Sequence, residues 1–207
     1  MDKLDLTKTD KLYYTAKTEP QLLHLEKAHY LSITGKGDPS EKSFSDKIQL
    51  LYATAYVTKF ICKALNNDFV VPKLEGLWSF DEEKYKAISM DEASLKIPRS
   101  EWNYRLMIRM PDFVTKEQLE KAIDIVITKK GLKEAVRIEF HEMTEGKVIQ
   151  ILHVGPFPNE PETLKKIHEF SRENNLKRNG MHHEIYLSDF RKTSPDKLKT
   201  LLREPVK

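Results

Sequence analysis

The stretch HHEIYLSDF, residues 182–190, places a glutamate in the middle of a segment that otherwise has the composition of a β-strand. Apolar and aromatic residues at this density are typical of a strand that buries one face. The stretch KLEGLWSF, residues 73–80, has the same layout: in both, a large aromatic residue follows the glutamate within three positions, and serine and phenylalanine come after it. This repetition predicts that Glu75 and Glu184 hold equivalent positions in two related units.

The segments around the two glutamates repeat the order strand, turn, helix, strand, strand. In the first unit, about residues 28–113, a strand begins at Ala28, and a helix follows at 42–65 in which apolar residues recur at helical spacing. In the second unit, about residues 135–207, Pro161 marks the start of the corresponding helix. Two such units predict an α+β fold in which the sheet is buried against helices and curves around a central cleft.

Three further segments complete the predicted organisation. Residues 1–27 are mixed and polar, so we expect an arm or a short edge element. Residues 115–130 should form a helix that joins the units, because Thr115 and Gln118 make a capping box and Gly131 follows the basic last turn. Residues 135–143 and 147–155 have strand composition with Glu145 and Gly146 between them, which predicts a β-hairpin.

The composition excludes several classes of protein. Hydrophobic residues make up 39% of the 207 and charged residues 32%, which is ordinary for a folded domain and argues against disorder. The net charge is +3 with scattered basic residues, so direct nucleic-acid binding is not expected. No apolar run approaches the roughly 20 residues of a membrane span, and the start lacks the apolar core of a signal peptide. We therefore expect a cytoplasmic protein with no membrane contact.

Metal and cofactor signatures are weak throughout. Cys62 stands alone, which excludes an internal disulfide and is typical of a small apolar residue in a helix. The histidines at 141, 168, 182 and 183 lack the paired spacing of a zinc site, and GKGD at 35–38 lacks the length and ending of a phosphate loop. We expect no metal and no cofactor.

The run QILHVGPFPNEPETLKKI (150–167), followed by GMHHEIYLSD (180–189), resembles the GyrI-like small-molecule-binding family. In that family a strand ends in a histidine-x-glycine-proline-aromatic turn, a helix follows, and a later strand carries a glutamate before an apolar residue and a tyrosine. The resemblance covers residues 28–207. It implies a curved antiparallel sheet made of two fused units, with helices on one side and a ligand cleft at the pseudo-twofold centre.

The resemblance leaves three functions open, because a fold alone does not decide function. Members of the family occur as effector domains of multidrug-sensing regulators, as a gyrase-inhibiting protein, and as hydrolases that open the cyclopropane of DNA-alkylating natural products. The arm before Ala28 is too short to hold a helix-turn-helix domain, so a complete regulator is not expected. A hydrolase, a binder of lipophilic aromatic cations that acts in detoxification, and a protein that contacts DNA gyrase stay as alternatives.

The resemblance places Glu184 at the cleft centre, where it would serve as a general base that activates water. Tyr186 shares its strand face by alternation and would orient it. The candidates for an aromatic clamp on a planar ligand are Trp78, Trp102, Tyr104 and Phe157, with Tyr52 and Tyr56 at the border.

Each of these residues has a structural alternative. The tryptophans are as well suited to core packing, and the turn residue His153 to a structural hydrogen bond. Glu75 is a further candidate for binding the ligand in the same cleft, but its motif departs from that of the second unit, because Gly76 replaces the isoleucine. A regular strand would put Glu75 on the face opposite Trp78, unless Gly76 marks a bulge. A buried Glu184 would also suit an aromatic cation as its counter-charge.

Overall fold

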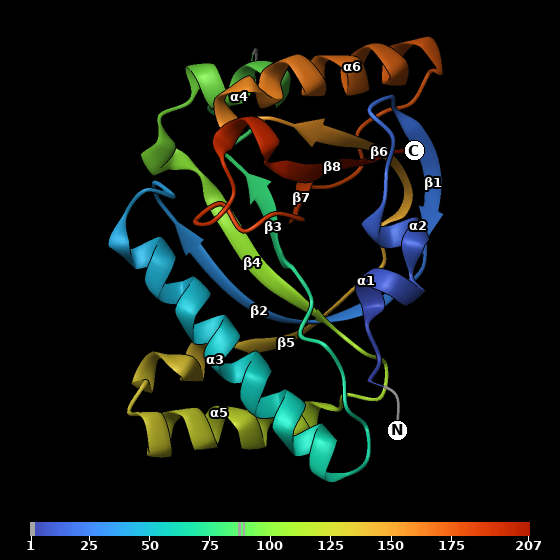
Figure 1. The fold of residues 1–207 in the computed structure, drawn as a ribbon. Helices are drawn as coiled ribbons and strands as arrows, with labels where there is room; N and C mark the ends of the chain where they lie inside the picture. The colour runs from blue at the N-terminus through green and yellow to red at the C-terminus, as the bar shows by residue number, and fades with distance from the viewer. Residues whose placement is uncertain (1–2, 87, 89) are drawn as a thin grey trace.

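Eight strands of the described chain form one antiparallel sheet in the order β1-β6-β8-β7-β3-β4-β2-β5 (Figure 1). The computed structural model describes residues 3–86, 88 and 90–207. The strands are β1 (Gln21–Leu25), β2 (Ala28–Lys36), β3 (Leu74–Ser79), β4 (Asn103–Met110), β5 (Glu139–Met143), β6 (Gly146–Val154), β7 (His182–Tyr186) and β8 (Lys199–Pro205). The helices are α1 (Leu6–Thr9), α2 (Lys11–Tyr14), α3 (Lys42–Ala64), α4 (Met90–Lys96), α5 (Lys116–Lys130) and α6 (Glu160–Glu173).

The sheet has an internal twofold pattern. One unit consists of β2, α3, β3 and β4, and the other of β6, α6, β7 and β8, with β3 and β7 paired at the centre. β4 and then β2 follow β3 outward, as β8 and then β6 follow β7 on the other side. The expected α+β fold of two fused strand-helix-strand-strand units is confirmed.

Helices α3 and α5 lie together at one end of the molecule, and α4 and α6 lie together at the other (Figure 1). α3 buries Leu51, Ala55 and Cys62 in the larger core, and α6 buries Leu164 and Ile167 in a smaller one. The joining helix α5 has the predicted capping box, and Gly131 ends it with the left-handed φ of 69° that favours glycine.

The predicted β-hairpin at Glu145 and Gly146 is wrong. β5 pairs with β2 at one edge of the sheet, whereas β6 pairs with β1 and β8 near the other edge. The two pairings share one register, since Met143 lies opposite Ala28 on β2 and Gly146 lies opposite Leu25 on β1. The chain therefore passes straight on from β5 into β6 instead of turning back on itself, and the Glu145 side chain between them contacts Arg203 and His183.

The N-terminal arm is more than an edge element. β1 extends the sheet beside β6. The short helices α1 and α2 are capped by Asp5 and Asp10, whose carboxylates accept hydrogen bonds from backbone N–H groups in the first turn. α2 buries Tyr13 and Tyr14 against the sheet face opposite α3. The arm thus covers one face of the central strands.

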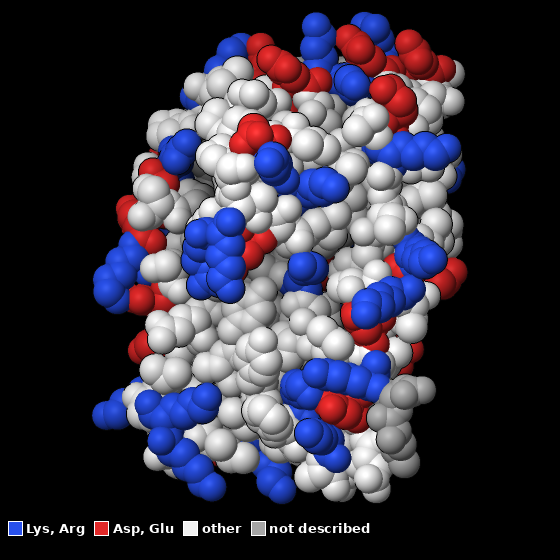
Figure 2. All heavy atoms as spheres, viewed as in Figure 1, with Lys and Arg blue, Asp and Glu red and all other residues white. Residues whose placement is uncertain are grey.

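No helix in the described part of the chain combines the length and apolar content that a membrane crossing requires. On the face drawn in Figure 2, lysine and arginine side chains are interspersed with aspartate and glutamate rather than gathered in one patch. This agrees with the scattered basic residues of the sequence.

Candidate functional site

A cleft of about 550 Å³ lies over the central strands β3 and β7. Its walls come from the start of α3, from residues 94–102 and from the turn at 157–160 that leads into α6. Aromatic and polar side chains alternate around it. The rings are Phe44, Trp78, Trp102, Phe157, Tyr186 and Phe190, and the charged groups on the floor are Glu160, His182 and Glu184.

Strand register decides which side chains of the central strands reach the cleft. His182, Glu184 and Tyr186 alternate along β7 and all three line it. On β3, Gly76 lies directly opposite Glu184, and Trp78 lies opposite His182. A Cβ atom at Gly76 would approach Trp78 Nε1 to 3.0 Å and Tyr186 Oη to 3.2 Å. The glycine therefore leaves room for these two polar atoms to meet above the strand.

Glu184 is held by a short series of donors. Trp78 Nε1 donates to Tyr186 Oη at 3.1 Å, and Tyr186 Oη donates to Glu184 Oε2 at 2.6 Å. Burial, and then the Glu184 carboxylate, raise the pKa of Tyr186 well above its usual value, so the phenol keeps its proton. With the Glu184 side chain only 14% exposed, these contacts fix a carboxylate among aromatic rings.

His182 links Glu184 to a second carboxylate. Its Nδ1 lies 2.7 Å from Glu204 Oε1, and its Nε2 lies 3.4 Å from Glu184 Oε1. Burial alone would lower the pKa of His182, but the Glu204 charge and the contacts with Glu184 outweigh it and raise this pKa to about 10. The ring is therefore an imidazolium between two carboxylates at neutral pH.

Glu160, the first residue of α6, is the third charged group on the cleft floor. Its Oε1 is buried without a hydrogen-bond partner among the described residues. Burial raises the pKa of Glu160 well above its usual value, and the Glu184 charge adds to this, while His182 opposes it. The cleft thus combines one carboxylate that has donors with a carboxyl group that favours its protonated form.

The aromatic rings form two walls. Phe44 and Trp78 stack with their centroids 5.9 Å apart and an interplanar angle of 22°, and Trp102 meets Trp78 edge-on at 6.3 Å. Phe157 meets Tyr186 edge-on at 6.1 Å, and Phe190 continues this second wall at 6.4 Å from Phe157. The space between the two walls suits a flat apolar molecule.

The structure brings together five of the predicted site residues, which are Glu184, Tyr186, Trp78, Trp102 and Phe157. The other predicted residues lie outside the cleft lining. Tyr104 is buried beneath Trp78, at 5.6 Å between ring centroids, and packs over Gly35. Tyr52 packs against the larger core, and Tyr56 is 48% exposed on α3.

The expected pairing of Glu75 with Glu184 in one cleft is corrected by the register. The β3 ladder continues through Gly76 without a bulge, so Glu75 points to the face that the N-terminal arm covers. Glu75 Oε2 accepts from Tyr13 Oη at 2.5 Å and lies 3.0 Å from His183 Nε2. It is a fully buried member of a structural network.

That network extends from the arm to the last strand. The Tyr13 ring lies between the guanidinium groups of Arg109 and Arg203, at 4.1 and 4.3 Å from its centroid. Arg203 Nη1 donates to Glu145 Oε2 at 2.7 Å, and Arg203 Nη2 donates to the Tyr13 carbonyl at 2.8 Å. The face opposite the cleft is therefore closed by paired charges.

His153, in the turn after β6, has a structural role. Its Nδ1 lies 2.8 Å from Thr163 Oγ1 and its Nε2 lies 3.3 Å from the Pro156 carbonyl. These contacts hold the turn that presents Phe157. Across the described residues, His, Cys, Asp and Glu side chains form no group of three or more suited to hold a metal ion.

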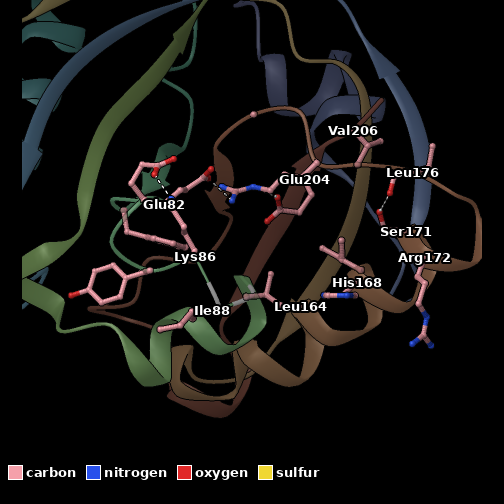
Figure 3. Close-up of a pocket in the computed structure, with 16 residues that line it drawn as sticks. Glu82, Lys86, Ile88, Leu164, His168, Ser171, Arg172, Leu176, Glu204 and Val206 are labelled. Carbon is pink, nitrogen blue, oxygen red and sulfur yellow. Dashed lines mark hydrogen bonds and ion pairs between the residues drawn. The ribbon is translucent and has the colours of Figure 1, made fainter.

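A second cavity of about 780 Å³ lies between α6 and a segment that includes residues 80–86 and Ile88 (Figure 3). Leu164 lines both cavities, and Glu204 reaches into the second one from β8. Because Glu204 also contacts His182, charged groups connect the second cavity to Glu184.

Sequence reasoning missed Glu160, His182, Phe44 and Phe190. The alternation of β7 already placed His182 on the same face as Glu184, so that signal was available. No sequence signal pointed to Glu160, because a glutamate in the first turn of a helix is usually solvated and interacts favourably with the helix dipole. Only the packing of α6 against β6 and α4 brings it into the interior.

Comparison with known proteins places this architecture among solved structures. A crystal structure of an uncharacterized conserved protein from Listeria innocua is 36% identical, covers 99% of this chain and 100% of its own, and superposes with a TM-score of 0.88. A second Listeria innocua structure, described as a hydrolase, is also 36% identical with the same coverage and a TM-score of 0.85. The C-terminal domain of EcmrR, at 12% identity, covers 91% of this chain and 97% of its own with a TM-score of 0.56, and so shares the fold alone. A comparison with curated protein sequences finds no match.

A duplicated antiparallel sheet with a cleft at its centre defines a class of small-molecule-binding domains. Residues 18–207 match the model of the GyrI-like small molecule binding domain, and the chain belongs to this family.

Proposed function

We propose that the protein binds a planar aromatic molecule in the cleft and hydrolyses a strained cyclopropane ring that this molecule carries. The observation that carries the proposal is the position of the Glu184 carboxylate, held by Tyr186 between two aromatic walls. The similarity to a Listeria innocua protein described as a hydrolase supports a reaction in addition to binding.

The chemistry requires few groups. A cyclopropane conjugated to a dienone is already electrophilic, so the protein must orient it, present a water molecule to the ring CH₂ and stabilise the developing charge. Glu184 accepts the proton of that water as the new C–O bond forms and the cyclopropane C–C bond breaks. Tyr186 and His182 fix the orientation of the carboxylate, while Trp78, Trp102 and Phe157 would hold the flat ligand.

The test uses a DNA-alkylating natural product of the spirocyclopropyl dienone type and follows the ring-opened alcohol by mass spectrometry. We expect multiple turnovers from the wild type. Glu184→Gln should keep ligand binding but lose roughly 100-fold or more in rate, the usual contribution of a general base. The control is Glu162→Gln, the same change at an exposed position on α6. Stoichiometric binding without product would refute the hydrolase.

A second function is favoured by the same carboxylate. An ionised Glu184 among aromatic rings would attract a lipophilic aromatic cation, and the protein would then act in detoxification by binding alone. Under this alternative, an aromatic cation raises the melting temperature of the wild type, and Glu184→Gln abolishes the shift. A neutral cyclopropane ligand that still stabilises Glu184→Gln would instead favour the hydrolase. Contact with DNA gyrase stays a prediction, tested by gyrase supercoiling with and without the protein.

A further inference from the structure

The two carboxyl groups that share the cleft have different surroundings. Glu184 accepts a 2.6 Å hydrogen bond from Tyr186 and lies 3.4 Å from the His182 ring. Glu160 lies on the opposite element, α6, and its buried Oε1 has neither contact. One group thus has a hydrogen-bond donor and a histidine ring beside it, and the other has no hydrogen-bond partner for its buried oxygen among the described residues.

The donors expected for the ligand oxygen are already engaged within the site. The Tyr186 proton points to Glu184, and the Trp78 N–H points to Tyr186. Arg99 also lines the cleft, but its side chain is 64% exposed and lies 3.7 Å from Asp38. The His182 ring faces Glu184, 3.4 Å from Nε2 to Oε1, whereas Glu160 Oε1 is a buried carboxyl oxygen of the lining without a hydrogen-bond partner among the described residues, so it is placed to serve a ligand oxygen.

We infer that Glu160 is the proton donor of the cleft, and that its carboxyl group protonates the ligand oxygen while Glu184 takes a proton from water. This inference rests on the proposed hydrolysis and assigns its acid. Two carboxyl groups whose surroundings favour opposite protonation states are a general arrangement for paired acid and base catalysis.

The step is balanced. Water oxygen bonds to the ring CH₂, the cyclopropane C–C bond breaks, and its electron pair enters the dienone, which becomes a phenol. The new phenol oxygen receives the Glu160 proton, and Glu184 receives the proton of water. Net addition of one water leaves the two glutamates with exchanged protonation, and proton exchange with solvent returns Glu160 to the acid and Glu184 to the carboxylate.

The groups that face Glu160 shift its pKa in opposite directions. Burial and the Glu184 charge from β7 raise its pKa, whereas the His182 imidazolium, also on β7, lowers it. The start of α6 opposes the protonated form as well, since a helix N-terminus favours negative charge. Burial, and then the same two glutamates, raise the pKa of Tyr186, so it stays neutral and adds no charge of its own.

The first arm of the test is kinetic. kcat is measured against pH for the wild type, Glu160→Gln and the exposed control Glu162→Gln. We expect Glu160→Gln to lower kcat about 100-fold, as loss of a general acid does, and to lose the decline in rate that accompanies deprotonation of Glu160 at high pH. A decline that is unchanged in Glu160→Gln belongs to His182 and would overturn the inference.

The second arm needs no turnover. The carbonyl stretch of a protonated carboxyl group is recorded by infrared spectroscopy at neutral pH, before and after adding the spirocyclopropyl dienone. We expect a band that shifts on binding, disappears in Glu160→Gln and persists in Glu162→Gln. A missing or unshifted band overturns the inference. If the shifted band appears without any product, the hydrolysis fails while the hydrogen bond from Glu160 to the ligand stands.

Discussion

Gly76 of β3 lies directly opposite Glu184 of β7 at the seam between the two units. The residue that faces the central carboxylate is thus the one residue type without a side chain. Trp78 and Tyr186 occupy the space above it, and their hydrogen bond is the support on which Glu184 rests.

Gly76→Ala should disturb the cleft more than the core. The new Cβ would lie 3.0 Å from Trp78 Nε1, tighter than an ordinary contact, so the Trp78–Tyr186 hydrogen bond must lengthen. We expect weaker ligand binding in a thermal-shift titration, while Ser79→Ala at the end of the same strand keeps wild-type binding. Equal affinities in the two variants would contradict this account of the glycine.

Tyr186→Phe removes the donor to Glu184 and leaves Trp78 Nε1 without its acceptor. A hydrogen bond to a charged group contributes about 1.5–3 kcal/mol, which corresponds to roughly a 10- to 100-fold loss of rate if the carboxylate must be oriented for reaction. The rate of turnover of the cyclopropane substrate measures this loss. Tyr56→Phe, the same change at an exposed tyrosine of α3, should have no effect. A wild-type rate in Tyr186→Phe would contradict this role of the tyrosine.

His182 should make stability depend on pH on the alkaline side. Its pKa is raised to about 10 in the folded protein, above the value of about 6.5 for an unperturbed histidine. The stabilisation is therefore complete below about pH 6.5 and is lost as the pH rises toward 10. Between these values this group alone lowers the free energy of unfolding by about 1.4 kcal/mol per pH unit. The free energy of unfolding, measured with urea at several pH values, should fall with this slope in the wild type but not in His182→Gln. The same pH dependence in both proteins would exclude the imidazolium.

Arg203 and Glu145 should prove strongly coupled. Arg203→Met leaves the buried Glu145 carboxylate without its main partner and should cost about 3–5 kcal/mol of unfolding free energy. Adding Glu145→Gln should recover part of that loss, because the unpaired charge is removed. Arg137→Met breaks a solvent-exposed pair with Glu134 and should cost less than about 1 kcal/mol. Additive effects of the two buried changes would show that the pair does not act as a unit.

The repeated pattern was sufficient to predict the two-unit fold, because each unit carries its own local signals. The capping box at Thr115 and the strand containing Glu184 are encoded within a few residues. The misplaced Glu75 came from matching motifs by glutamate, whereas the ladder aligns Gly76 with Glu184. Alternation within KLEGLWSF already separated Glu75 from Trp78.

The remaining errors concern contacts between distant parts of the chain. Glu145 and Gly146 have the composition of a hairpin turn, but Arg203, which fixes Glu145, lies far along the chain. Burial of Glu160 likewise depends on how α6 packs against β6 and α4. A local pattern contains no information about such partners, so the network and the acid of the cleft required the structure.

The contact between Tyr13 and Arg203 joins opposite ends of the chain, separated by 190 residues in sequence. Such contacts cost loop-closure entropy before they contribute stability, and folds that depend on them form slowly. During synthesis the arm would emerge before both guanidinium groups that pack on Tyr13: Arg109 follows with β4, and Arg203 only with β8. Until Arg203 emerges, one face of the Tyr13 ring would lack its partner, so this contact is completed by a residue made 190 positions after Tyr13.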